Sequence, residues 1–134
     1  MSMVRFTFEK GLNKSILQRR HGSAHHLIAS TLGYEFTQKM HAIHGRGEYI
    51  VSCFGPTILR IPGERSKEGD QSFRPRTRRG RAALSSVMVE VGYPGGIKFL
   101  CLDAEWWLLN AHDNTRFVIL MKIERDSFAL HIEC

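Results

Sequence analysis

The spacing of hydrophobic residues in the first third of the chain predicts an amphipathic helix. Apolar residues recur three and four positions apart from Ser15 to Leu32, so they would form one stripe along a helix. Ser15 followed by Gln18 is typical of a capping box, and Gly33 is a common residue just beyond a helix end. We therefore predict a first helix over Ser15–Leu32.

Three segments in the middle of the chain have the composition of β-strands. Tyr49–Cys53 and Thr57–Ile61 are rich in β-branched and aromatic residues, and the Gly-Pro pair between them is typical of a tight reversal. Ser86–Val91 is almost wholly apolar, as expected for a strand in the centre of a sheet. Strand alternation would place Val87, Val89 and Val91 on one face and Met88 and Glu90 on the other.

Glu90 is the one charged residue in this apolar strand. A carboxylate buried in such a strand is costly unless it is paired, protonated or bound to metal. A functional carboxylate is therefore one interpretation of Glu90, and an edge strand with Glu90 in water is the other.

The last third of the chain predicts a second helix followed by two strands. The helix would cover Ile97–Asn110, with Trp107 on its buried stripe. Much of its remaining surface is also apolar, so we expect other structure or a partner to cover it. Arg116–Ile123 is apolar up to Lys122, as a buried strand would be, and Ser127–Glu133 alternates like a half-buried one.

The order of these elements predicts an α/β fold in which helices flank one mixed sheet. The 134 residues fit a single domain, 1–134. Hydrophobic residues make up 43% of the chain, which argues against full disorder.

Composition also narrows the location of the protein in the cell. No apolar run approaches the roughly 18 residues of a membrane span, and the N-terminus has no pattern of a secretory signal. The 3 cysteines form no closely spaced pair, which argues against a disulfide scaffold or a cysteine zinc site. We therefore expect an intracellular protein of the cytoplasm or nucleus that does not bind a membrane.

The positive charge of the chain is concentrated in one segment. Lys and Arg number 19 against 13 Asp and Glu, for a formal net charge of +6. Five arginines fall within FRPRTRRGRAA, which lacks apolar periodicity and carries Pro and Gly, so it reads as an exposed loop. They are Arg74, Arg76, Arg78, Arg79 and Arg81. Either this loop is a solvated connection, or its arginines contact the phosphates of a nucleic acid.

Asp70 and Glu90 are candidate metal ligands. Asp70 ends a polar segment that leads into the predicted sheet, and two carboxylates at one end of adjacent strands could hold Mg²⁺. Such a cation could activate water and stabilise charge on a phosphodiester, with help from a nearby lysine. The alternative for Asp70 is a simple turn residue.

Two blocks of the sequence are distinctive when they are taken together. Ser66–Pro75 reads SKEGDQSFRP, and Val89–Gly92 reads VEVG and is followed by DAEWWL at Asp103–Leu108. Both resemble PD-(D/E)xK nuclease-like proteins of filamentous fungi, which carry SKEPD-x-SF-x-P and VxEVG followed by DAxWWL. The wider superfamily has a restriction-endonuclease-like core of αβββαβ order. The resemblance implies that core here.

The resemblance also implies roles for individual residues. Asp70 is similar to the first metal-binding acid and Glu90 to the second, for Mg²⁺ or Mn²⁺. The usual signature has lysine two residues after the second acid, where this chain has Gly92. A lysine from elsewhere would have to replace it, and Lys98 and Lys67 are the candidates.

Two functions follow from the resemblance. One is a metal-dependent nuclease that cleaves DNA or RNA, with the arginine loop on the backbone. The other is a catalytically degenerate nuclease-fold module that binds nucleic acid or protein; Gly92, and Pro94–Gly96 where the family has a polar turn, favour it. A third interpretation is a fragment truncated at its C-terminus, whose apolar second helix faces a missing segment or a second copy in a homodimer.

Overall fold

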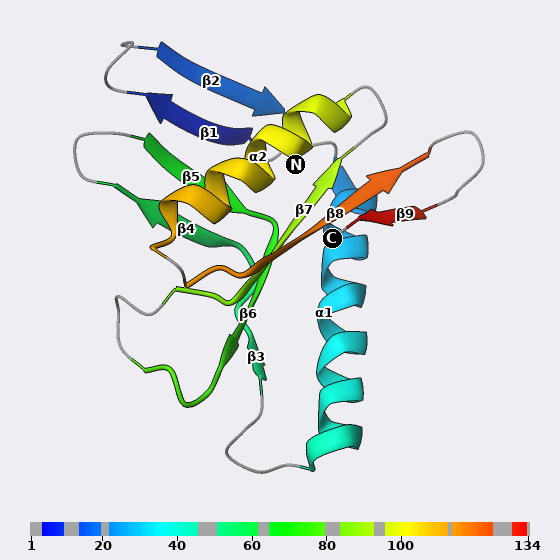
Figure 1. The fold of residues 1–134 in the computed structure, drawn as a ribbon. Helices are drawn as coiled ribbons and strands as arrows, with labels where there is room; N and C mark the ends of the chain where they lie inside the picture. The colour runs from blue at the N-terminus through cyan, green and yellow to red at the C-terminus, as the bar shows by residue number, and fades with distance from the viewer. Residues whose placement is uncertain are drawn as a thin grey trace.

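Two helices and nine strands make up the described part of the chain in the computed structural model (Figure 1). The structure describes residues 4–9, 14–19, 22–45, 51–61, 65–79, 84–92, 96–112, 114–124 and 130–133, with side chains from residue 24 to 124 of these except residue 65. The helices are α1, Gly22–His44, and α2, Ile97–Asn110. The strands are β1 (Val4–Glu9), β2 (Lys14–Arg19), β3 (Val51–Cys53), β4 (Thr57–Arg60), β5 (Arg65–Gly69), β6 (Gln71–Pro75), β7 (Val87–Gly92), β8 (Phe117–Ile123) and β9 (Leu130–Glu133).

The strands form two sheets. The larger has the order β3-β6-β7-β8-β9, in which β7 and β8 are parallel and the other neighbours antiparallel. The parallel pair is joined by α2, as parallel neighbours need a crossover connection. The smaller sheet has the order β2-β1-β5-β4 and is antiparallel throughout. The predicted α/β fold with helices flanking a mixed sheet is confirmed, whereas the second sheet was not predicted.

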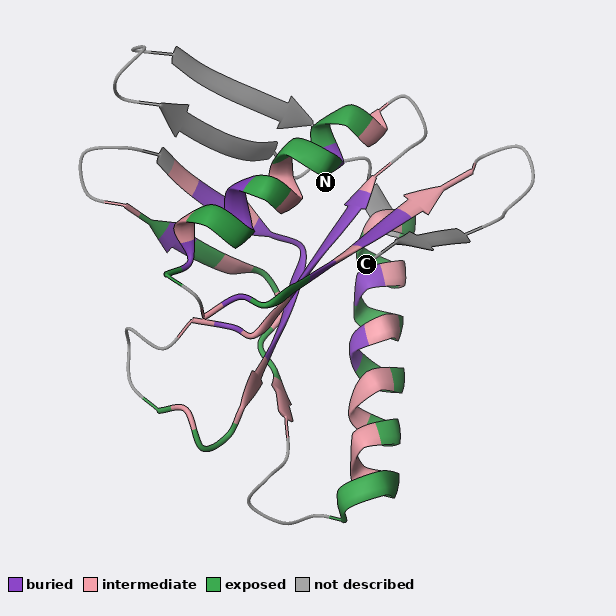
Figure 2. Cartoon of the chain, in the orientation of Figure 1, coloured by how far each residue is buried: buried purple, intermediate pink, exposed green. Residues whose placement is uncertain are grey.

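The two helices cover opposite faces of the larger sheet. α1 packs on one face, where Val89 and Val91 of β7 are buried with Phe73 of β6. α2 packs on the other face, where Met88 of β7 lies in a core with Trp107. The alternation predicted for β7 is therefore confirmed. Figure 2 shows that the buried residues concentrate where β7 crosses the middle of the molecule.

A bend in two long strands connects the sheets. β5 runs on into β6 with Asp70 between them, and their partners β4 and β3 are separated by the segment that contains Gly55, which has a φ of 65°. The N–H of Phe54 still donates to the carbonyl of Ser72 at 3.0 Å, so pairing continues through the bend. Next to the bend, Gly69 leaves room for α2, because a Cβ there would lie 3.3 Å from the Trp107 ring.

The N-terminal helix was predicted in the wrong place. Residues 14–19 form β2, which pairs antiparallel with β1, and the helix begins at Gly22 and continues to His44. The alternating sequence VRFTFE of β1 supplies a partner that favours strand over helix for the segment after it. Gly33 does not end the helix. A Cβ at Gly33 would lie 2.8 Å from Nε2 of Gln71, so this glycine allows α1 to approach the sheet closely.

The C-terminal elements agree with the prediction. α2 has the predicted bounds and Trp107 is buried; β7 is shifted by one residue at both ends, and β8 begins one residue later than predicted. Of the predicted final strand Ser127–Glu133, Leu130–Glu133 forms β9, and residues 127–129 lie outside the described residues. The outer face of α2 remains exposed, with Phe99, Leu102 and Leu109 in water. No described helix is both long enough and apolar enough to cross a membrane.

Candidate functional site

Asp70 is a buried residue at the junction of the two sheets. Its Oδ2 accepts a hydrogen bond from the backbone N–H of Val91 at 2.8 Å and lies 3.1 Å from Nε2 of His25 on α1. Its own backbone N–H donates to the carbonyl of Val89 at 3.0 Å. Asp70 is therefore held by β7 and by α1, in a role beyond that of a simple turn residue.

Glu90 is fully buried in the central strand β7, as the apolar sequence around it predicts. Its Oε1 accepts a hydrogen bond from Nε1 of Trp107 at 2.6 Å and lies 3.5 Å from Nζ of Lys67. Lys67, on β5, is itself buried and forms a second ion pair with Asp103 on α2. This cluster of Lys67, Glu90, Asp103 and Trp107 ties together one strand from each sheet and the helix above them.

The carboxylates of Asp70 and Glu90 point toward opposite helices. Asp70 contacts α1 through His25, whereas Glu90 contacts α2 through Trp107. Strand register brings their backbones side by side, because Gln71 pairs with Val89 one position away. The two residues are therefore neighbours along the sheet, but their side chains are directed differently.

The contacts described above use one oxygen of each carboxylate, Oδ2 of Asp70 and Oε1 of Glu90. N–H donors face Oδ2 of Asp70 and Oε1 of Glu90, and the ammonium of Lys67 lies 3.5 Å from Oε1 of Glu90. Within the described residues, no group of three or more His, Cys, Asp or Glu side chains is placed to bind a metal ion. The Mg²⁺ or Mn²⁺ site that the sequence suggests at Asp70 and Glu90 stays a prediction.

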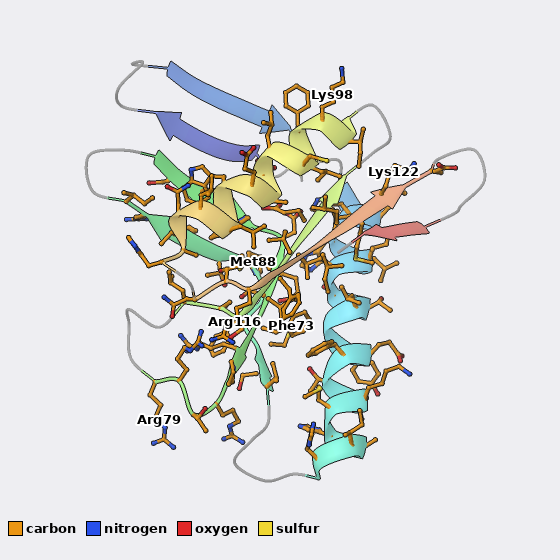
Figure 3. The ribbon with its side chains drawn as sticks, in the orientation of Figure 1. Phe73, Arg79, Met88, Lys98, Arg116 and Lys122 are labelled. Atoms are coloured by element: carbon orange, nitrogen blue, oxygen red, sulfur yellow. The ribbon has the colours of Figure 1, made fainter. Side chains whose placement is uncertain are left out.

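The two candidate lysines lie in different environments. Lys67 contacts Glu90, whereas Lys98 is exposed in the first turn of α2 and extends away from the sheet (Figure 3). Gly92, where the usual signature has lysine, lies against α2, since a Cβ there would meet the Leu100 side chain at 3.0 Å. The position at which the PD-(D/E)xK signature has lysine is therefore packed against α2 in this chain.

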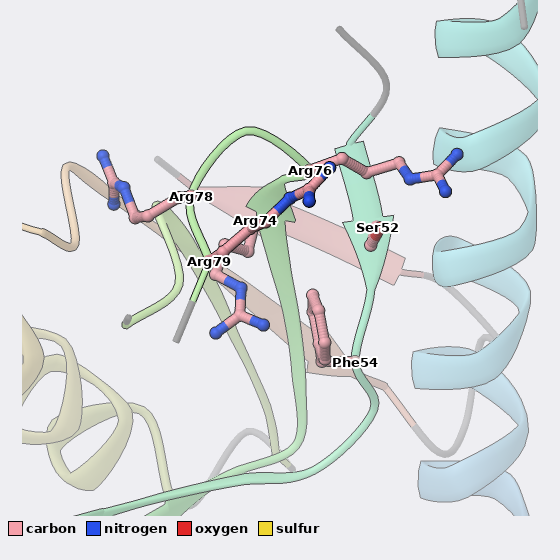
Figure 4. A pocket seen from close by; sticks show the side chains of 6 residues that line it. All are labelled: Ser52, Phe54, Arg74, Arg76, Arg78 and Arg79. Carbon is pink, nitrogen blue, oxygen red and sulfur yellow. The ribbon is translucent and has the colours of Figure 1, made fainter. Parts of the chain in front are cut away.

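A second candidate site is an open hollow at the far end of β6, which we call the arginine hollow. Its volume is about 360 Å³. Figure 4 shows the side chains that line it, contributed by β3, β6 and the residues that follow each. They are Ser52, Phe54, Arg74, Arg76, Arg78 and Arg79. Four of the five arginines of the predicted loop therefore line one hollow, with Arg76 and Arg78 extending in opposite directions (Figure 4), and Arg81 lies outside the described residues.

The four arginines have different local roles. Arg78 donates through Nη1 to the carbonyls of Leu84 and Asn114, both at 3.3 Å, so it fixes the path of the segment. The guanidinium carbon of Arg74 lies 4.1 Å from the centre of the Phe54 ring, an arrangement typical of a cation–π contact. Arg76 and Arg79 are exposed at the rim and are open to a ligand.

The arginine hollow lies apart from the buried carboxylates. Asp70 precedes the first residue of β6 and Arg74 comes four residues later, which corresponds to about 13 Å along a strand. Arg76 and Arg79 lie beyond the end of that strand. The sequence places the arginines between Asp70 and Glu90, whereas the structure carries them away from both.

Phe54 and Asp103 are among the residues of these sites that the sequence did not reveal. Phe54 was not recognised, because its neighbours Gly55 and Pro56 suggested only a tight turn. Asp103 entered only as the first residue of the DAEWWL block and was given no role. The signal for Asp103 was its spacing of four from Trp107, which puts both on one side of α2.

Comparison with known proteins identifies no relative of this chain: no family model matches it, and neither a curated protein nor a solved structure is significantly similar to it.

Proposed function

We propose that this chain is a nucleic-acid-binding module that grips the phosphate backbone through its arginine hollow. The observation that carries the proposal is that Arg74, Arg76, Arg78 and Arg79 all line one open hollow. No acidic side chain is among the described residues that line it. Guanidinium groups bind phosphate oxygens through paired N–H donors, so such a cluster suits a polyanion.

The local chemistry of the arginines supports a backbone-binding role. Arg76 and Arg79 lie exposed on a segment that Arg78 fixes to the body of the protein, so their charges are held in place rather than on a free tail. Contacts of this kind to phosphates give affinity without sequence preference, and the affinity falls as salt rises. Binding without strong sequence preference is therefore the expected mode.

The order of the elements supports a restriction-endonuclease-like scaffold for this module. α1 is followed by β3, β6 and β7 as consecutive neighbours of the mixed sheet, and then by α2 and the parallel strand β8. This sequence of elements corresponds to αβββαβ when β4 and β5 are treated as extensions of the bent strands. The buried and oppositely directed carboxylates favour a version of that scaffold that binds without cleaving.

The proposal is tested by the affinity of a fluorescent oligonucleotide for the wild type and two double variants. Arg76→Ala/Arg79→Ala removes two charges from the hollow, and the matched control Arg60→Ala/Lys98→Ala removes two exposed charges on β4 and α2. We expect the hollow variant to bind about tenfold more weakly, with a slope of log K against log salt reduced by about 1.5. Equal losses in both variants would show that only total charge matters, and the hollow would not be the site.

Metal-dependent cleavage of phosphodiesters is the second candidate function. One observation favours it: Lys67 lies 3.5 Å from Glu90, and Asp70 comes just before β6, the strand that pairs with the strand of Glu90, so the residue types of a nuclease site are close together. The Asp70 carboxylate would have to turn toward α2. The test is plasmid cleavage with Mg²⁺ or Mn²⁺ by the wild type, Asp70→Ala and Glu90→Ala. Cleavage by the wild type alone would establish this function, and equal behaviour of all three proteins would exclude these residues from catalysis.

A further inference from the structure

The arginine hollow contains an exposed aromatic ring that backbone binding alone does not require. Phe54 is 46% exposed, and the guanidinium of Arg74 lies 4.1 Å from its ring centre. Core packing does not explain the position of the Phe54 ring. The core on the α1 side is filled by another phenylalanine, Phe73 of β6. The ring and the guanidinium form a stacked pair at the surface, among charges that suit phosphate.

The backbone holds the Phe54 ring in a defined position. The N–H of Phe54 donates to the carbonyl of Ser72 at 3.0 Å, which continues the pairing of β3 with β6. Ser52 pairs directly with Arg74, and positions 52 and 54 lie on one side of the chain because strand residues alternate. The strand therefore presents Ser52 and Phe54 together toward the hollow, beside the arginines of the neighbouring strand and turn.

Exposed aromatic rings beside arginines recognise bases that are not paired. In a duplex the faces of the bases are covered by the neighbouring base pairs. A protein therefore contacts the phosphates, the sugars and the edges of the bases, and no base face is free to stack. In a single strand each base has a free face that stacks on aromatic rings or guanidinium planes. A volume of about 360 Å³ is within the range of small-ligand pockets and suits one nucleotide.

We infer that the hollow binds an unpaired nucleotide of a single strand, with its base stacked on the Phe54–Arg74 pair and its adjoining phosphates at Arg76 and Arg79. This inference rests on the proposed function and makes it specific for single strands. A free nucleoside monophosphate offers the same chemistry but only one phosphate group, whereas a strand reaches both rim arginines with successive phosphates. The strand is therefore the expected ligand.

The test compares three labelled probes of roughly 12 nucleotides: a thymidine single strand, the same strand paired in a duplex, and an abasic strand that has phosphates but no bases. The proteins are the wild type, Phe54→Ala, and the matched control Phe99→Ala, which removes a similarly exposed ring from α2. Thermal unfolding of each variant verifies the fold. We expect the wild type to prefer the thymidine strand over the duplex and the abasic strand.

The effect of Phe54→Ala distinguishes base stacking from backbone binding. It should weaken binding of the thymidine strand about tenfold and change binding of the duplex and the abasic strand less than about twofold. Phe99→Ala should change none of them.

Equal affinity of the wild type for all three probes, with the loss in Arg76→Ala/Arg79→Ala preserved, would refute stacking and leave the proposed function intact. Absence of binding to every probe would refute both. Full competition by an equal concentration of thymidine monophosphate would assign the hollow to free nucleotides and overturn the inference.

Discussion

Replacement of Lys67 by methionine tests whether the buried cluster is a structural ion-pair network. Lys67 is 1% exposed and lies between two carboxylates, at 3.5 Å from Glu90 and in contact with Asp103. Methionine has a similar length and fills the space without the charge. The substitution therefore leaves the packing nearly unchanged but removes the cation that neutralises two acidic groups at the meeting point of the sheets.

The loss of stability expected for Lys67→Met is large because both partners of the ion pair, Lys67 and Glu90, are buried. Removal of one partner from a buried ion pair typically costs about 3–5 kcal/mol, because the opposite charge stays in a low-dielectric environment. For Lys67→Met we expect that range, a large share of the roughly 5–15 kcal/mol that stabilises a typical domain. Glu90→Gln should cost less, about 1–3 kcal/mol, because Lys67 keeps Asp103 and the amide oxygen can still accept from Trp107.

Urea unfolding of the wild type, both single variants and Lys67→Met/Glu90→Gln measures these energies. The double variant should be more stable than the sum of the single losses predicts, with a coupling of about 1–3 kcal/mol. A midpoint for Lys67→Met equal to that of the wild type would refute the network. Additive losses would show that Lys67 and Glu90 do not interact, and the placement of Lys67 would then need another explanation.

Two further variants test the packing around these sites. Gly69→Ala should lower the free energy of unfolding by about 1–3 kcal/mol, because the added methyl group meets Met88 and Trp107; an unchanged urea midpoint would contradict this. Arg78→Ala should speed cleavage within residues 74–79 by a non-specific protease, because the hydrogen bonds that fix this segment to two backbone carbonyls are lost. Unchanged cleavage would mean that the segment is held by other contacts.

Long elements with an unambiguous pattern could be predicted from the sequence. The apolar runs of β7 and β8 were recognised because strands in the centre of a sheet leave a continuous apolar signal. The 14-residue α2 was recognised from its length and from the helical spacing of its buried stripe. The same reasoning identified Glu90 as a buried carboxylate in need of a partner. The N-terminal hairpin was missed because Ile16 and Leu17 fit a helical stripe as well as a strand, and only pairing with β1 decides between them.

The directions of the site residues could not be predicted from the sequence. Asp70 is turned toward α1 by His25, which lies 45 positions away in the chain, and Glu90 is held by Lys67 across the boundary between the sheets. Such contacts depend on how the strands bend, and spacing along the sequence does not reveal the bend. The arginine cluster was visible as a composition, but its separation from the carboxylates follows from the direction of β6.

Photo-crosslinking to a single strand that carries 5-bromouridine shows most directly where the nucleic acid lies on this protein. The crosslinked peptides would be identified by mass spectrometry. If the arginine hollow is the binding site, crosslinks should concentrate at Phe54 and within residues 74–79 and should disappear in Arg76→Ala/Arg79→Ala. Crosslinks concentrated around Lys67, Asp70 and Glu90 would contradict this and would place the nucleic acid at the buried carboxylates.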